Sequence, residues 1–341
     1  MTSREIVLKT LTFAHPERIA MGLPAPYPND FCGAGPSEDP AHPETDWIEA
    51  KPGRWERTDE WGNTWARIEG FSKGEVCGGA LEDWDRLDEI ELPDYDLPER
   101  YERARETFAA HPDMFRLGHI QGFPFNIARK MRRLDNFLVD VLIEPDRAER
   151  LLGMVEEQIG HAIRRLGEAG ADGVMFPEDW GTQEQLLVRP ELWHRMFKPG
   201  FQRLCRTAHQ AGVYVFMHSC GYIYEAMEGL IEAGIDLFQF DQPQLYGVDQ
   251  LADEFGGRVT FWCPVDIQKT LQTRDAKPIE ADARKMIERL GAEGGGFIAG
   301  YYGSNEAIGL DPRWQDIACR AFVKHGAPDL WPQFEAQPAC Q

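Results

Sequence analysis

The sequence lacks the features of secreted, membrane-spanning and nucleic-acid-binding proteins. Its first residues, 1–9, carry charges where a secretory signal would need an apolar stretch. No run approaches the roughly 18 consecutive apolar residues of a transmembrane helix. Basic residues number 36 against 57 acidic ones, giving a net charge of −21, so the chain is poor in the Lys and Arg that neutralise phosphates. We therefore expect a cytoplasmic protein with neither a membrane nor a nucleic-acid partner.

Two further absences limit the redox state and the fold. The seven cysteines are an odd number in a long chain without a signal, which indicates reduced thiols that are available as ligands. No G-x-G-x-x-G turn follows any predicted strand, which argues against the open, doubly wound sheet that remains the structural alternative. Hydrophobic residues make up 43% of the chain, enough for a sizeable core.

From about residue 113 onward, short apolar runs alternate with longer helical patterns. The predicted strands are 114–120, 173–176, 213–218, 237–240, 259–263 and 296–299. The predicted helices are 145–168, 190–210, 222–233, 248–255 and 281–290. Ala-Gly pairs at 169–170, 211–212 and 233–234 mark helix ends, where glycine adopts the left-handed conformation. We predict an α/β fold, a (β/α)8 TIM barrel, with its main βα repeats at 113–327.

The first part of the chain, 1–112, has a different character and is expected to be an N-terminal extension that caps the barrel. Residues 24–52 are rich in Pro, Gly and acidic side chains and predict an irregular loop. Residues 54–58 and 64–68 predict a β-hairpin, and 97–110 a helix. Because this part shows no core of its own, we treat 1–341 as one domain.

The strongest candidate for chemistry is the strand end at 216–221, FMHSCG, which presents His218 and Cys220 one residue apart. Imidazole nitrogen and thiolate sulfur are ligands that Zn²⁺ prefers. Cys263 ends a second predicted strand and would supply a third ligand if both strands belong to one parallel sheet. Glu178 is a candidate fourth ligand or base. Each could instead be an ordinary core or loop residue, since single cysteines are usually small buried hydrophobes.

Other polar residues also follow predicted strands, at the end of the barrel where active sites lie. The catalytic candidates are Glu178, Asp179, Asp241, Asp266 and Tyr301, and the candidates for contacting a cofactor are Trp180, Gln183, His119 and Tyr302. Asp241 and Asp266 could orient metal ligands, hold a substrate group or simply cap the next helix. The aromatic residues could line a pocket or belong to the core.

Several of these segments resemble the uroporphyrinogen decarboxylase superfamily. The resemblance rests on 178–183 (EDWGTQ), 189–193 (RPELW), 197–199 (FKP), 218–221 (HSCG) and 264–268 (PVDIQ), in this order, and covers roughly residues 110 to 325. It implies a single (β/α)8 barrel. The decarboxylases themselves carry an Arg-rich N-terminal segment and a late Gly-His-Gly. This chain has PERIA at 16–20 and YYGS at 301–304 instead, so that activity is not expected.

The other branch of the superfamily is similar in its His-x-Cys pair and a later Cys. It comprises zinc-dependent methyltransferases that move methyl groups between a methylated substrate, a corrinoid protein and a thiol. One departure is that Cys263 lies about two strands earlier than the corresponding cysteine. The resemblance implies Zn²⁺, a cobalamin or other corrinoid carried by a partner protein, and a small methylated substrate, and it leaves a homodimer open.

Three functions follow from these observations. The leading hypothesis is a zinc-dependent methyltransferase or demethylase with His218, Cys220, Cys263 and Glu178 around the metal. The second is a metal-free decarboxylase or lyase acting on a smaller acid, in which Asp179 stabilises developing positive charge. The third is a non-catalytic protein that binds a corrinoid or another small molecule, favoured if the acids at the strand ends prove to be caps and ion pairs.

Overall fold

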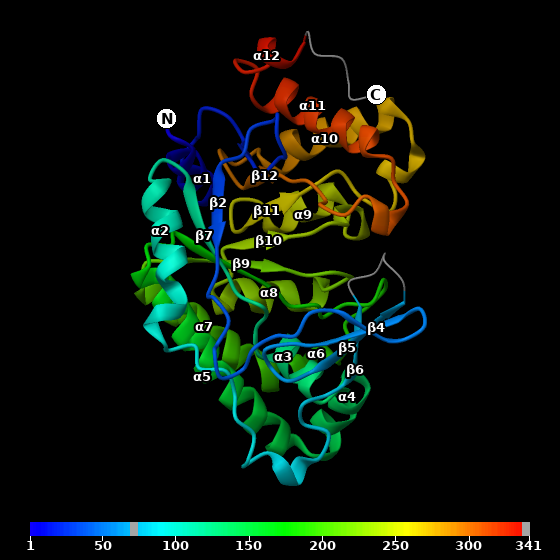
Figure 1. Cartoon of the computed structure of the whole chain (residues 1–341). Coiled ribbons are helices and arrows are strands. Elements are labelled where there is room, and N and C mark those ends of the chain that lie inside the picture. The colour runs from blue at the N-terminus through cyan, green and yellow to red at the C-terminus, as the bar shows by residue number, and fades with distance from the viewer. Residues whose placement is uncertain (69–73, 336–341) are drawn as a thin grey trace.

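Parallel strands form the centre of the molecule. The computed structural model describes residues 1–68 and 74–335, and in this part of the chain eight parallel strands form one curled sheet in the order β1-β12-β11-β10-β9-β8-β7-β2 (Figure 1). They are β1 (Ala20–Met21), β2 (Phe31–Ala34), β7 (Phe115–His119), β8 (Gly173–Pro177), β9 (Tyr214–His218), β10 (Leu237–Gln239), β11 (Thr260–Cys263) and β12 (Phe297–Ala299). The outermost strands in this order, β1 and β2, are consecutive in the chain, and Asp30 N donates to Met21 O at 2.8 Å. The predicted TIM-barrel fold is confirmed.

Helices surround this sheet (Figure 1). They are α1 (Ser3–Leu11), α2 (Glu102–Ala110), α3 (Pro124–Met131), α4 (Leu134–Ile143), α5 (Pro145–Glu168), α6 (Pro190–Leu192), α7 (Lys198–Gln210), α8 (Tyr224–Ala233), α9 (Val248–Phe255), α10 (Ala276–Leu290), α11 (Pro312–Gly326) and α12 (Pro332–Glu335). Gly170, Gly212 and Gly234 have φ of +99°, +72° and +110°, which confirms the left-handed helix ends expected at the Ala-Gly pairs. Among the described residues, no helix combines the length and apolar character needed to cross a bilayer.

Aromatic rings fill the inside of the barrel. The rings of Phe31 and Trp262 stack with centroids 4.4 Å apart, and Phe115 and Phe216 stack at 5.5 Å. These four side chains come from β2, β11, β7 and β9, so each stacked pair joins two strands that are not neighbours in the sheet. Helix α1 packs on the same interior cluster, and its apolar face is fully buried. The interior is therefore a packed core, and the accessible end of the barrel is the one where the strands terminate.

A second, antiparallel sheet caps that end of the barrel. It contains β3 (Ile48–Lys51), β4 (Arg54–Thr58), β5 (Thr64–Ile68) and β6 (Glu75–Gly78), and the predicted β4–β5 hairpin is confirmed. The cap is attached by a fully buried ion pair between Glu60 and Arg100, and Tyr95 also donates to Glu60 at 2.8 Å. Leu81 N donates to Met131 O at 2.9 Å, which joins the segment after β6 to helix α3.

The structure differs from the sequence-based expectation at the N-terminus. Strands β1 and β2 belong to the barrel, although they lie in the part of the chain expected to form an extension and a loop. They are only two and four residues long. Hydrogen bonds to β12 and β7 hold them in place, and such long-range pairing leaves no local periodicity to detect.

Candidate metal site

Three potential metal ligands meet at the strand ends. Cys220 Sγ lies 3.3 Å from His218 Nε2, and this nitrogen lies 3.9 Å from Asp179 Oδ1. One ligand atom from each residue lies within 4.8 Å of the other two. His218 is the last residue of β9, whereas Asp179 follows β8, so neighbouring parallel strands bring the three residues together. We call Asp179, His218 and Cys220 the triad.

The tautomer of His218 is set by a chain of two hydrogen bonds. Asp241 Oδ1 accepts from Gln239 Nε2 at 2.8 Å, so the amide oxygen of Gln239 points the other way, toward Nδ1 of His218, with which it forms a very short hydrogen bond. An amide oxygen can only accept, and Nδ1 therefore carries the proton. The lone pair of Nε2 is left facing Cys220 and Asp179, as a metal ligand requires.

Asp179 is held in the triad from two sides. Its Oδ1 accepts from the backbone N–H of Cys220 at 2.8 Å, and its Oδ2 lies 3.5 Å from Nη2 of Arg129. The backbones of the loops after β8 and β9 also lie in direct contact. A Cβ on Gly221 would come within 2.2 Å of Gly181 O, so only glycine fits there. Gly221 has φ of +74°, which favours glycine further. The loops are thus fixed to each other where the triad forms.

The triad has the donor types and spacing that suit a zinc ion. Imidazole nitrogen, thiolate sulfur and carboxylate oxygen are its common ligands, and at bond lengths of about 2.0–2.3 Å tetrahedral neighbours lie roughly 3.3–3.8 Å apart. The two separations of 3.3 and 3.9 Å are close to this range. Three protein ligands leave a fourth position for substrate, which is typical of catalytic zinc.

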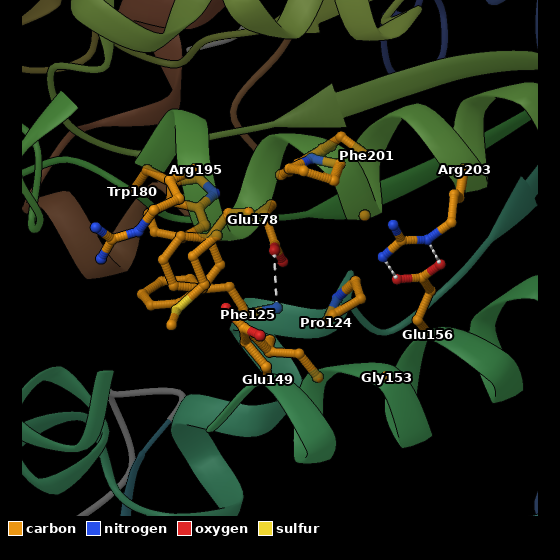
Figure 2. A pocket seen from close by; sticks show the side chains of 15 residues that line it. Pro124, Phe125, Glu149, Gly153, Glu156, Glu178, Trp180, Arg195, Phe201 and Arg203 are labelled. Carbon is orange, nitrogen blue, oxygen red and sulfur yellow. Dashed lines mark hydrogen bonds and ion pairs between the residues drawn. The ribbon is translucent and has the colours of Figure 1, made fainter. Parts of the chain in front are cut away.

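Glu178, expected as a ligand or base, faces away from the triad. Its carboxylate is fully buried and accepts backbone N–H groups from Phe123, Phe125 and Asn126 at 3.0–3.1 Å, at the start of helix α3. Figure 2 shows it in an outer cavity of about 300 Å³, beside Phe125 and Trp180. Burial raises the pKa of Glu178 to about 8, although these hydrogen bonds and Arg129 act to lower it. Glu178 therefore holds the start of helix α3. Its neighbour Asp179, and not Glu178, lies beside His218 and Cys220.

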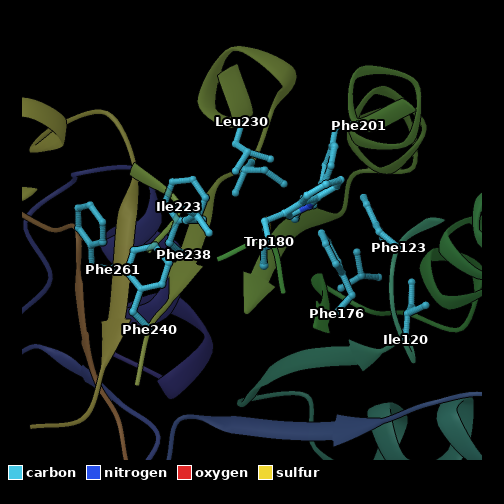
Figure 3. Packing of buried hydrophobic residues seen from close by; sticks show 14 of the residues in the cluster. Ile120, Phe123, Phe176, Trp180, Phe201, Ile223, Leu230, Phe238, Phe240 and Phe261 are labelled. Carbon is cyan, nitrogen blue, oxygen red and sulfur yellow. The ribbon is translucent and has the colours of Figure 1, made fainter. Parts of the chain in front are cut away.

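Trp180, expected to contact a cofactor, belongs to the core outside the barrel. It is fully buried and stacks on Phe125 with ring centroids 3.7 Å apart. Figure 3 shows it among the apolar side chains between strands and helices, near Phe201. Because side chains alternate along an extended segment, Glu178 and Trp180 point to the helices while Asp179 points to the barrel mouth.

Cys263, expected as the third ligand, is not part of the triad. In the sheet, Trp262 pairs with Gln239, and its ring reaches the barrel interior, so the next side chain, Cys263, points outward. Cys263 is fully buried in the outer core, and burial raises the pKa of its thiol well above the usual range. The expected ligand set is corrected: Asp179 lies beside His218 and Cys220, and Cys263 does not.

The remaining strand-end acids divide into two kinds. Asp266 is buried and accepts backbone N–H groups from Gln244, Gln268 and Lys269 at 2.6–3.0 Å, so it caps the local backbone. Asp241 acts on His218 through Gln239, as described above. Of the alternatives open for these two residues, capping fits Asp266 and ligand orientation fits Asp241.

Other expected residues surround the mouth. A cavity of about 180 Å³ is lined by Cys220, Asp241 and Tyr302 among others. His119 is the last residue of β7, where the surrounding protein desolvates its ring and lowers its pKa. Tyr301 accepts a hydrogen bond from Asn305 at 2.8 Å.

Gln183 reaches over the mouth to Gln242, at 3.3 Å. It thus links the loops that follow β8 and β10. No disulfide joins the six cysteines that the structure describes, and Cys340 lies outside the described residues.

Two functional residues were missed from the sequence. Gln239 is the last residue of β10, and Asp241 follows it by two residues; in an extended segment this spacing places both on one side, a signal that could have linked them to His218. Arg129 lies on α3, far from any strand end in sequence, and no local pattern connects it to Asp179.

Comparison with known proteins agrees with this architecture. Residues 76–301 match the family described as uroporphyrinogen decarboxylase (URO-D). The sequence matches no curated protein. Among solved structures, a methyltransferase from Methanosarcina mazei is similar with a TM-score of 0.58 and 16% identity, covering 74% of this chain and 73% of that one. A B12-independent methionine synthase from Shewanella sp. W3-18-1 has a TM-score of 0.43 and 12% identity, covering 80% and 72%, too distant a likeness to carry an argument.

Proposed function

Since the chain belongs to the uroporphyrinogen decarboxylase family, a family of enzymes, we propose that it is a zinc-dependent methyltransferase or demethylase. It would move a methyl group between a small methylated substrate and a corrinoid or thiol acceptor. The single observation that carries the proposal is the triad, with one nitrogen, one sulfur and one oxygen ligand within 4.8 Å at the mouth of a barrel.

In this proposal Asp179, His218 and Cys220 hold the metal. Bound zinc supplies a Lewis acid that keeps a thiol as the thiolate or polarises the heteroatom of a methyl donor. Asp241 and Gln239 hold the proton on Nδ1 of His218 and so keep Nε2 available. Arg129 compensates the negative charge of Asp179 from the side opposite Cys220.

The mouth beside the triad suits a small substrate. The cavity next to Cys220 is bounded by Phe240, Tyr246 and Tyr302, which supply apolar walls, and by Asp241. A corrinoid carried by a partner protein would approach from this side, because α1 and the packed interior occupy the other end of the barrel. The apolar walls limit the water that reaches a bound methyl donor.

Paired cysteine variants test the metal site. Cys220→Ser replaces a thiolate ligand by a hydroxyl of far higher pKa, and we expect zinc to fall from about one equivalent per chain to below about a tenth. Cys263→Ala is the matched control, because Cys263 points into the outer core, and we expect it to retain zinc. Zinc is measured by elemental analysis on protein never exposed to chelator, with melting curves on the same samples.

Activity is measured as demethylation of small methoxy or methylamine compounds with a cob(I)alamin acceptor. We expect Cys220→Ser to lose turnover while melting close to the wild type, and Cys263→Ala to keep it. If wild-type protein contains no zinc, or if Cys220→Ser keeps wild-type turnover, the metal mechanism is wrong. A metal-free lyase that uses Asp179 would then take its place.

A further inference from the structure

A second cavity lies between the cap sheet and helix α3. It measures about 320 Å³, and its lining includes Trp61 and Trp65 from the cap and Lys130 from α3. Lys130 follows Arg129, the residue that contacts Asp179. Lys130 also interacts electrostatically with Asp59 in the cap and with Asp179 in the triad. Helix α3 thus links this cavity to the triad.

The acidic groups of this cavity already have partners. Glu44 forms an ion pair with Arg57 at 2.8 Å. Asp59 accepts from the backbone and side chain of Asn63 at 2.9 and 3.1 Å and from Trp65 Nε1 at 2.6 Å. Both oxygens of Asp59 therefore accept hydrogen bonds from neutral donors, and Glu44 is paired with Arg57.

Lys130 lacks such a partner. Within residues 1–68 and 74–335 its ammonium group makes no hydrogen bond or ion pair and only lies over the Trp65 ring, 5.3 Å from the centroid. Burial and the neighbouring Arg129 lower its pKa. A desolvated ammonium group without an acceptor is costly, so an anion that enters the cavity and pairs with Lys130 would be stabilised.

We propose that this cavity binds the carboxylate of a small, flat organic acid, with Lys130 as its ion-pair partner and the Trp61 and Trp65 rings against its apolar body. Two observations fix this class of ligand. Lys130 is a cationic donor without an acceptor in the described part of the chain, which calls for an anion, and the indole rings favour a planar body. The claim that the ligand is the substrate, with its methyl group toward Cys220, rests on the proposed function. Binding itself does not.

Three probes separate charge from shape. Benzoate is planar and anionic, benzamide is its neutral counterpart, and cyclohexanecarboxylate keeps the charge but not the flat ring. We expect benzoate to bind at least about tenfold more tightly than benzamide, because a charge-assisted hydrogen bond is lost. Cyclohexanecarboxylate should bind with intermediate affinity. Calorimetry gives the affinities, and quenching of tryptophan fluorescence reports whether the ligand lies near the indoles.

Variants of one residue complete the test. Lys130→Met should weaken benzoate binding at least about tenfold and leave benzamide binding unchanged. Lys130→Arg keeps the positive charge and should largely retain benzoate binding. Lys277→Met removes an exposed lysine on α10 and should have no effect on the binding of benzoate. The absence of saturable benzoate binding, or equal binding to wild type and Lys130→Met, would overturn the proposal.

Zinc content distinguishes this proposal from the proposed function. If benzoate binds through Lys130 but the protein holds no zinc, the proposed binding of a carboxylate is supported and the methyltransferase mechanism fails. If zinc and demethylation are present but benzoate does not bind, only the cavity proposal fails. Melting curves of each variant ensure that a loss of binding reflects the side chain and not unfolding.

Discussion

The hydrogen-bond chain behind His218 gives the sharpest prediction. Gln239→Met removes the acceptor that keeps the proton on Nδ1, while Met preserves the length and much of the volume of the side chain. The imidazole is then free to rotate and to carry its proton on Nε2, the nitrogen that faces Cys220. Loss of an outer hydrogen-bond partner of a metal ligand typically lowers metal affinity 10- to 100-fold, which corresponds to about 1.4–2.8 kcal/mol.

Zinc affinity is measured by competition with a chromophoric chelator at fixed pH. We expect Gln239→Met to weaken binding by about that factor, and Asp241→Asn to weaken it less, because an asparagine oxygen can still accept from the amide of Gln239. Gln250→Met, the same change at an exposed position on α9, serves as the control. An affinity of Gln239→Met within about twofold of the wild type would refute the argument that this chain sets the tautomer.

Three further predictions concern stability. The pKa of Glu178 is raised to about 8 from 4.5, so between these pH values the folded protein binds a proton that the unfolded chain has lost. The free energy of unfolding should therefore fall as pH rises from about 5 to 8, by at most about 5 kcal/mol. In melting curves recorded across this range, the melting temperature of Glu178→Gln should depend less on pH than that of the wild type. Arg100→Met leaves the buried charge of Glu60 unpaired and should lower the free energy of unfolding by about 3–5 kcal/mol, or the melting temperature by roughly 4–7 °C; a shift under about 2 °C would contradict this. Gly221→Ala should lower both the melting temperature and zinc content, since a Cβ would collide with Gly181 O; unchanged zinc would show that the loops can separate without losing the triad.

The βα repeats could be predicted because their signals are local. Amphipathic spacing, as in α5, and the glycines that end helices can be read from a few consecutive residues. Strands β1 and β2 could not, since their two and four residues are held by hydrogen bonds to β12 and β7. The same limit explains why the barrel repeats begin earlier in the chain than expected.

Within the candidate site, only the pair whose proximity follows from sequence spacing alone was predicted correctly. His218 and Cys220 stand one residue apart and share a side of the chain, and the structure brings them together. Choosing between Glu178 and Asp179, or between Trp262 and Cys263, requires the direction in which each side chain leaves its strand. That direction follows from the pairing of β10 with β11 and from the start of α3, which are tertiary features.

The pairing of β1 with β12 also constrains the order of folding. Among the described residues, the first barrel strand pairs with β12 in the central sheet, and nearly the whole chain separates the two strands. During synthesis β1 therefore emerges long before its partner β12 exists and must wait without it, although α1 can already pack on β7. Contacts so distant in sequence cost the most loop entropy, so closure of the barrel should be a late event that couples both ends of the chain. The apolar face of α1 belongs to a cluster that includes Ile298 of β12, so we expect part of this face to stay exposed until the barrel closes.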